Sequence, residues 1–156
     1  MDILLDGPQR FENLCAVVRT LEVFGFDRCL VIDPFRLVRE RHGKRRRRVA
    51  RGVSAGAFER VDLVRIDEPE VWLAGQTRRI VATVATEGAT PLPAFSFRPD
   101  DLIVFGNESS GVSPAVLAHA SAHITIPQRG QTRSLNLAVA AGMVLYAAQL
   151  GPGAPG

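Results

Sequence analysis

The strongest constraint on the fold is an alternation between short apolar runs and longer segments whose apolar residues recur at helical spacing. The apolar runs predict β-strands at residues 28–32, 61–66, 79–83, 101–105 and 122–126. The helical spacing predicts a helical turn at residues 54–58 and helices at residues 12–24, 68–75, 113–119 and 134–150. Strands that alternate with helices predict an α/β fold, with a mostly parallel sheet and helices on both faces.

Sheets of this kind bind ligands beyond the carboxyl ends of their strands. The loops after Thr83, Phe105 and Ile126 are therefore the first places to look for a site. Residues 87–99 and 127–133 are predicted as loops. Residues 1–150 are predicted as one domain, followed by a disordered Gly- and Pro-rich tail at residues 151–156.

Composition places the chain among ordinary globular proteins, since 46% of its 156 residues are hydrophobic and 22% are charged. Its two cysteines and three scattered histidines form no zinc pattern, so we expect no metal. The longest uncharged apolar stretch, residues 137–148, is shorter than the roughly 20 residues of a membrane span. We therefore expect a soluble cytoplasmic protein without membrane contact.

Charge is concentrated in residues 36–51, where nine basic residues stand against the single acid Glu40. This segment carries +8 and, because the whole chain carries +3, the remainder carries −5. A basic patch on an acidic body is typical of a site for a polyanion. The alternative is a solvated surface segment with no partner.

Three segments carry more polar groups than packing requires. On the first helix, Asn13 and Arg19 are six residues apart, and Arg19 has apolar neighbours. An unpaired charge would be costly there, unless the side chain extends along the helix into solvent.

The second segment follows the strand at residues 101–105 and contains Gly106, Glu108 and Gly111. Gly106 would let a ligand approach the backbone closely, and Glu108 could be a base or an anchor for a cation. An ordinary turn between strand and helix is the alternative. In the third segment, Ser134 is the predicted helix cap, and Asn136 is unusual in so apolar a helix.

In this order and spacing, the three segments resemble the motifs of the SpoU/TrmH branch of the SPOUT RNA methyltransferases. The matching residues are Asn13, Arg19 and Gly25, then Gly106, Glu108 and Gly111, and finally Ile126, Pro127, Ser134, Leu135 and Asn136. The resemblance covers residues 4–149 and includes residues 53–57, which are similar to a connection in that family. It departs from the family pattern at Cys15, Asn107 and Ala147.

The resemblance implies a SPOUT domain with a deep trefoil knot at its C-terminal end. It implies metal-free transfer of a methyl group from S-adenosylmethionine to a ribose 2′-hydroxyl of tRNA or rRNA. It also implies a homodimer in which Arg19 of one subunit faces the cofactor of the other. A non-catalytic SPOUT-like RNA-binding module is the alternative, and a general nucleotide-binding α/β domain rests on fold analogy alone.

Each candidate residue takes a role from this resemblance. Arg19 would clamp a phosphate and stabilise negative charge at the hydroxyl, with a role as base left open. The other candidate catalytic residues would hold the loops and the ribose, and they are Asn13, Glu108, Ser134 and Asn136. The implied cofactor-binding residues are Thr83, Val84, Ala85, Gly106, Asn107, Ile126, Gln128, Ser134 and Leu135. The implied RNA-binding residues are Arg41, Lys44, Arg45, Arg46, Arg47, Arg48 and Arg51.

Overall fold

The computed structural model describes residues 1–38, 44–132 and 134–150, and for residues 44–47 and 51 it describes the backbone alone. The strands are β1 (Asp2–Asp6), β2 (Arg28–Ile32), β3 (Asp62–Ile66), β4 (Ile80–Thr83), β5 (Thr90–Pro91), β6 (Leu102–Phe105) and β7 (Ala122–Thr125). The α-helices are α1 (Phe11–Val23), α2 (Lys44–Ser54), α3 (Pro69–Ala74), α4 (Pro114–His119) and α5 (Leu137–Gln149). Two short 3₁₀ helices, η2 (Ala57–Glu59) and η3 (Leu92–Ala94), complete the described elements.

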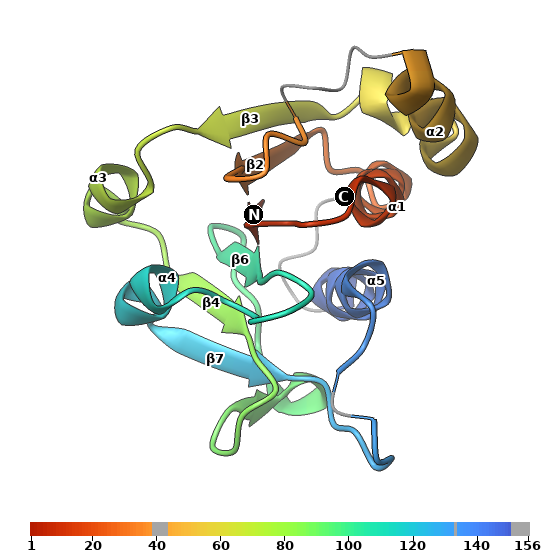
Figure 1. Ribbon diagram of the computed structural model, residues 1–156. Coiled ribbons are helices and arrows are strands. Elements are labelled where there is room, and N and C mark those ends of the chain that lie inside the picture. Colours follow the sequence, from red (N-terminus) through yellow and green to blue (C-terminus); the bar gives the residue numbers. More distant parts are fainter. Residues whose placement is uncertain (39–43, 133, 151–156) are drawn as a thin grey trace.

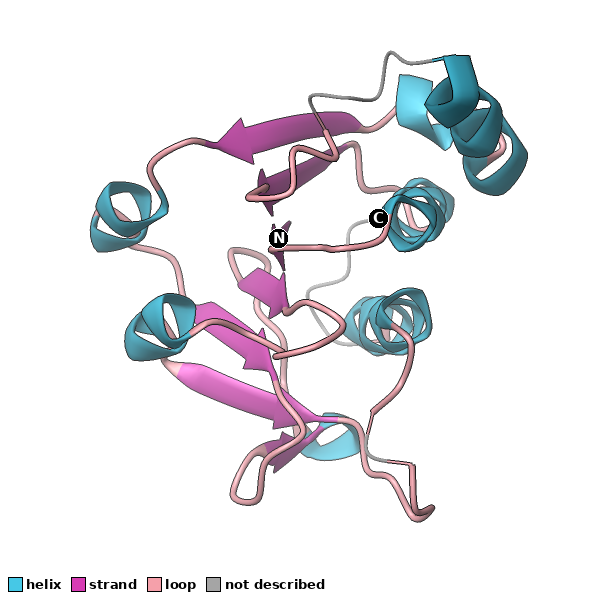
Figure 2. Ribbon diagram, in the orientation of Figure 1, coloured by secondary structure: helices cyan, strands magenta, loops and turns pink. Residues whose placement is uncertain are grey.

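The strands form one seven-stranded sheet in the order β3-β2-β1-β6-β4-β7-β5, and the paired strands run parallel. Helices α1 and α5 cover one face, α3 and α4 cover the other, and α2 packs against α1 (Figures 1 and 2). The predicted α/β class, with a parallel sheet and helices on both faces, is therefore confirmed.

Strand β1 shows why each face has its own core. Successive side chains of a strand point to opposite faces. Ile3 and Leu5 belong to the apolar cluster under α1 and α5, whereas Leu4 belongs to the cluster under α3 and α4. All three side chains are fully buried, which places β1 at the centre of the molecule.

The structure adds elements that the sequence analysis did not predict. Strand β1 is one of them, and β5 and η3 lie within the predicted loop at residues 87–99. Much of the basic segment forms α2, because its apolar residues return at helical spacing and bury Ala50 against the core cluster. The helical turn predicted at residues 54–58 is replaced by the end of α2 and by η2.

Helix α5 begins later than predicted. Asn136 is its N-cap, with Oδ1 accepting a hydrogen bond from the Ala138 N–H at 2.9 Å. The prediction that Ser134 caps this helix is therefore wrong. At the start of α4, the N-cap Ser113 accepts a hydrogen bond from the Val116 N–H. The predicted tail at residues 151–156 lies outside the described residues.

Helix α5 is buried on one side only. Residues such as Ala141 and Leu145 are fully buried, but the opposite side exposes a stripe of large apolar side chains. This α5 stripe consists of Val139, Met143, Tyr146 and Leu150, which are 44–70% exposed. In a single chain, the apolar character of α5 therefore exceeds what the core buries. In the described ranges, no helix combines the length and apolar character needed to cross a membrane.

Candidate active site

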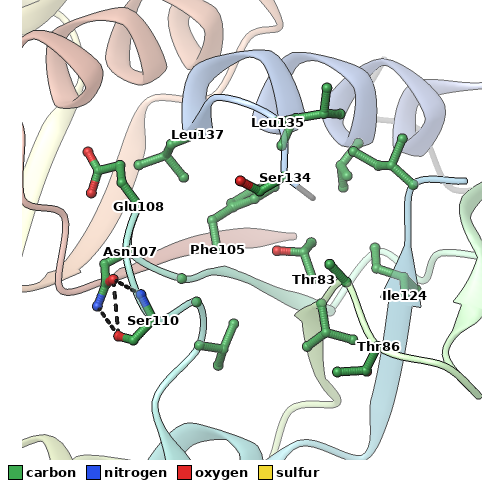
Figure 3. A pocket seen from close by; sticks show the side chains of 18 of the residues that line it. Thr83, Thr86, Phe105, Asn107, Glu108, Ser110, Ile124, Ser134, Leu135 and Leu137 are labelled. Carbon is green, nitrogen blue, oxygen red and sulfur yellow. Dashed lines mark hydrogen bonds between the residues drawn. The ribbon is translucent and has the colours of Figure 1, made fainter. Parts of the chain in front are cut away.

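A cavity of about 390 Å³ lies at the carboxyl edge of the sheet, among the loops after β4, β6 and β7 and the segment that leads into α5 (Figure 3). Its volume lies within the usual range for small-molecule sites. Thr83, Phe105 and Ile124 contribute from the ends of the three strands, and Ser134 and Leu135 from the segment before α5. The loops selected from the sequence therefore surround one cavity.

All nine residues predicted to bind a cofactor line this cavity: Thr83, Val84, Ala85, Gly106, Asn107, Ile126, Gln128, Ser134 and Leu135. The lining also includes residues that the sequence analysis did not select, among them Thr86, Leu117 and Ala140. Much of the wall is apolar, and Glu108 is the only ionisable side chain among the described lining residues.

A chain of side-chain hydrogen bonds joins the three sequence segments at the edge of the cavity. The Asn13 Nδ2 group on α1 donates to Glu108 Oε1 at 2.7 Å. In turn, Asn136 Nδ2 at the start of α5 donates to Asn13 Oδ1 at 3.0 Å. We call these three residues the Asn–Glu–Asn network. The structure brings together three of the five predicted catalytic residues.

Glu108 is the centre of this network. Its carboxylate also accepts hydrogen bonds from the backbone N–H groups of Gln9 at 2.9 Å and Arg10 at 3.2 Å. Burial on its own raises the pKa of Glu108, but the bonds from Asn13 and from nearby backbone N–H groups outweigh it and leave the pKa lowered. The lowered pKa makes this carboxylate a weaker proton acceptor than an ordinary Glu, so a role as an anchor of the loops is favoured over a role as general base.

Glu108→Gln is expected to destabilise the protein by about 1–3 kcal/mol at neutral pH, because part-buried donors lose a charged acceptor. Since the folded pKa is lowered, this contribution is present above the unfolded pKa of about 4.3 and is lost as the pH falls through the folded value. Urea unfolding of both proteins at pH 7 and near pH 3 measures the difference. Glu87→Gln, in an exposed loop, is the control. A stability gap that grows on acidification would contradict this account.

Gly106 has a structural role that the sequence analysis did not predict. A Cβ at this position would lie 2.0 Å from the carbonyl carbon of Gly111 and 2.1 Å from the Val112 nitrogen. The space is thus filled by the loop's own backbone, where Asn107 and Gly111 exchange N–H···O bonds of 3.0 and 3.2 Å. The lack of a side chain at Gly106 is therefore required by the fold of the loop that carries Glu108, and the approach of a ligand to its backbone stays a prediction.

The two remaining predicted catalytic residues lie apart from the network. Ser134 is exposed and lines the cavity. Arg19 is also exposed, does not line the cavity, and donates from Nη1 to the Val53 carbonyl oxygen at 3.4 Å. Its guanidinium therefore extends into solvent in a single chain, which is the alternative that the sequence analysis left open for Arg19.

The basic residues can be placed only in part. Arg48 is exposed on α2, whose backbone carries Lys44, Arg45, Arg46, Arg47 and Arg51. Arg41 lies outside the described residues, as do the side chains of the other five. Gln9 and Arg10 were missed because they follow the unpredicted strand β1.

Neither cysteine is suited to nucleophilic chemistry. Burial raises the pKa of Cys15 to about 12 and also raises the pKa of the fully buried Cys29. Both thiols thus stay protonated at neutral pH. Across the described ranges, no three His, Cys, Asp or Glu side chains form a group that could hold a metal ion.

A parallel α/β sheet with a mostly apolar cavity at its carboxyl edge defines a protein that binds a small organic ligand between its loops. The chain belongs to the SpoU rRNA Methylase family, whose model matches residues 1–146.

Similar proteins of known function or structure support this assignment. The chain is 30% identical to a tRNA (guanosine(18)-2′-O)-methyltransferase of Aquifex aeolicus, covering 94% of the chain and 67% of that protein. It is 33% identical to the 23S rRNA (guanosine-2′-O-)-methyltransferase RlmB of Acinetobacter baylyi, covering 94% and 58%. The crystal structure of the SpoU methyltransferase AviRb from Streptomyces viridochromogenes in complex with AdoMet matches with a TM-score of 0.77 and 26% identity, covering 95% and 56%. The chain thus spans about three fifths of the length of such relatives.

Proposed function

We propose that the protein transfers a methyl group from S-adenosylmethionine to a ribose 2′-hydroxyl of tRNA or rRNA. The observation that carries this proposal is the Asn–Glu–Asn network, which links all three family motifs beside the cavity. The names of the two relatives, a tRNA and a 23S rRNA 2′-O-methyltransferase, support the same chemistry and RNA classes.

The cavity suits S-adenosylmethionine by its chemistry. Apolar side chains such as Ile124, Ile126 and Leu137 offer a surface for a flat base, and Thr83 and Ser134 offer hydroxyl groups. Among the described lining residues no side chain is cationic, so a ligand with a sulfonium charge meets no repulsion there. The AdoMet-bound state of AviRb supports this ligand. When bound, S-adenosylmethionine supplies the electrophilic methyl group.

The chain's own residues then bind and orient the acceptor. We assign Arg19 to hold a phosphate near the target ribose and to stabilise negative charge on the 2′-oxygen. An Arg is a poor proton acceptor because its guanidinium stays protonated in proteins, so its charge and planar fork are what it contributes. Ser134 is assigned to the ribose, while Asn13, Glu108 and Asn136 act as positioning residues that fix the loops.

A homodimer would bring Arg19 to a site. Arg19 does not line the cavity of its own chain, so its assignment requires the cavity of a second chain. The α5 stripe is an apolar surface of the kind that subunit contacts bury. We infer a dimer that buries this stripe and completes each site across the interface.

Met143→Glu is expected to produce monomers and to abolish methyl transfer, since the change places a charge in the α5 stripe. Sedimentation velocity and a methyl-transfer assay at the same protein concentration measure both effects. Val71→Glu is the matched control, because Val71 is 68% exposed on α3, on the opposite face of the sheet. A wild-type protein that sediments as a fully active monomer would contradict the inference.

The basic segment is assigned to RNA phosphates. Replacing Arg45, Arg46, Arg47 and Arg48 with Gln is expected to weaken RNA binding. The slope of the logarithm of the binding constant against the logarithm of the salt concentration should become less steep by roughly 0.7–0.9 for each lost phosphate contact. Cofactor affinity should hardly change. Filter binding over a salt series and calorimetry with S-adenosylmethionine measure the two effects, and Arg98→Gln on an exposed turn is the control. Loss of cofactor affinity with intact RNA binding would mean that the segment is misassigned.

Two further features belong to the same proposal. We infer that the C-terminal segment of the domain at residues 1–150 passes through a loop to form a deep trefoil knot, supported by the likeness to SpoU structures. We also propose a cytoplasmic location, which the RNA substrate class favours.

The proposal is tested with labelled S-adenosylmethionine and total bacterial RNA, followed by counting of acid-precipitable label. The expected result is incorporation that EDTA does not abolish, together with calorimetric binding of the cofactor. An RNA-binding module without catalysis would bind RNA and incorporate no label. Activity lost to EDTA and restored by one divalent ion, with RNA folding controlled, would overturn the metal-free mechanism.

A further inference from the structure

Phe35 is an exposed aromatic residue at the tip of the turn that follows β2. Its side chain is 49% exposed, although Asp33 and Leu37 beside it are only 8% and 4% exposed. Polar residues usually occupy such turns. Among the described residues, no aromatic ring or cation stacks on Phe35. Within the part of the chain that the structure describes, packing therefore gives no reason for an aromatic ring at this position.

The turn that carries Phe35 is rigid. The Arg36 N–H donates to the Asp33 carbonyl oxygen at 3.2 Å, and Pro34 restricts the backbone between them. The two carboxylate oxygens of Asp33 accept from the Leu37 and Val38 N–H groups at 2.7 and 2.9 Å. Arg36 has a φ of 56°, a left-handed conformation that is costly for a residue other than glycine. A backbone held in this way loses little conformational freedom when a ligand stacks on its side chain.

The same turn lies between the cavity and the basic segment. A Cβ built on Gly7 would be 3.7 Å from Pro34 Cγ and 3.8 Å from Asn107 Nδ2, so the backbone of a single residue separates the turn from a residue that lines the cavity. In the sequence, Phe35 directly precedes residues 36–51, which carry +8. A polyanion drawn to that segment and reaching the cavity would meet the Phe35 ring.

We propose that Phe35 is a stacking platform for one unpaired base of the RNA, close to the nucleotide whose ribose enters the cavity. Aromatic rings bind bases of any identity through their faces, and neighbouring arginines hold the phosphates of the same strand. The proposal rests on the proposed function for its RNA partner. The stacking contact itself does not depend on methyl transfer and can be measured without it.

The test compares two labelled probes of equal length, a single-stranded RNA oligonucleotide and an oligomer with the same ribose-phosphate backbone and no bases. Phe35→Ala is expected to weaken binding of the RNA roughly 5- to 150-fold, which corresponds to about 1–3 kcal/mol per stacked base. Binding of the abasic probe should be unchanged, and the salt dependence for both probes should match wild type. Phe35→Tyr should bind like wild type, whereas Phe35→Leu, which keeps apolar bulk without an aromatic face, should resemble Phe35→Ala.

Two controls separate this contact from other causes. Arg48→Gln should lower the salt dependence for both probes, because it removes a charge and no ring. Val71→Ala, at a second exposed apolar position, should change nothing.

Several outcomes would overturn the proposal. The first is equal RNA binding by wild type and Phe35→Ala, and the second is an equal loss of affinity for both probes. The third is an altered salt dependence of binding in Phe35→Ala. The fourth is a Phe35→Ala protein that sediments as a smaller species than wild type, which would place Phe35 between copies of the chain. If base-dependent stacking is found but no RNA accepts a methyl group, the proposed function fails while the stacking contact stands.

Discussion

Arg19→Ala is expected to lower methyl-transfer turnover by roughly 10²-fold or more, while dimer formation and cofactor binding stay near wild type. The reason is that Arg19 is exposed and bonded only to the Val53 carbonyl oxygen among described groups, so its removal leaves no buried partner unpaired. A positive group beside a developing alkoxide contributes an effect of that size. Single-turnover kinetics, sedimentation and calorimetry separate the chemical step from assembly and binding.

Arg19→Lys distinguishes a planar fork from a simple charge, and it should restore little of the turnover. Arg60→Ala is the matched control. Arg60 is an exposed arginine that forms an ion pair of 2.7 Å with Glu22, and Glu22 lies on α1, the helix that carries Arg19. That variant should keep normal turnover. Near-normal turnover in Arg19→Ala would remove Arg19 from the mechanism.

Gly106→Ala is expected to destabilise the protein by roughly 3 kcal/mol and to abolish cofactor binding. The added Cβ would collide with the backbone of Gly111 and Val112, which no side-chain rotation can relieve. The loop must open, and the mutual bonds between Asn107 and Gly111 and the position of Glu108 are lost with it. Thermal unfolding and calorimetry measure the two losses.

Gly52→Ala is the control for this substitution. Its Cβ would meet nothing within 4 Å, and Gly52 lies within α2, so the variant should be as stable as wild type or slightly more stable. A Gly106→Ala protein with normal stability and normal cofactor affinity would show that the loop tolerates a different path.

The sequence predicts the sheet and the site edge because both follow from local patterns. The apolar run at residues 28–32 matches β2 in both bounds, and Thr83 and Phe105 end their strands as predicted. Since parallel strands end at one edge, the residues after them converge on one cavity. Periodicity and turn chemistry are sufficient for this part of the fold.

Other features depend on tertiary contacts. Strand β1 is only five residues long and is stabilised by β2 and β6 on its two sides, partners that are distant in sequence. The cap of α5 is Asn136 rather than Ser134, although both residue types favour that position. The Asn–Glu–Asn network spans residues 95 and 123 positions apart, which no local pattern encodes.

The solvent-exposed position of the Arg19 side chain could not be predicted from its neighbours in the sequence. Its sequence neighbours are apolar, and Val17 and Val18 are fully buried, yet the Arg19 side chain points away from this core. Helical geometry turns successive residues by about 100°, so adjacent positions lie on different faces. The proposed dimer would give this exposed group a site in the cavity of the partner chain.

The most direct test of the central claim is the position of the transferred methyl group. RNA labelled by the protein is hydrolysed with alkali and the products are separated by size and analysed by mass spectrometry. The account predicts label in an alkali-resistant dinucleotide, because a methylated 2′-oxygen cannot attack the neighbouring phosphate. Label confined to mononucleotides and carried by a base would contradict it.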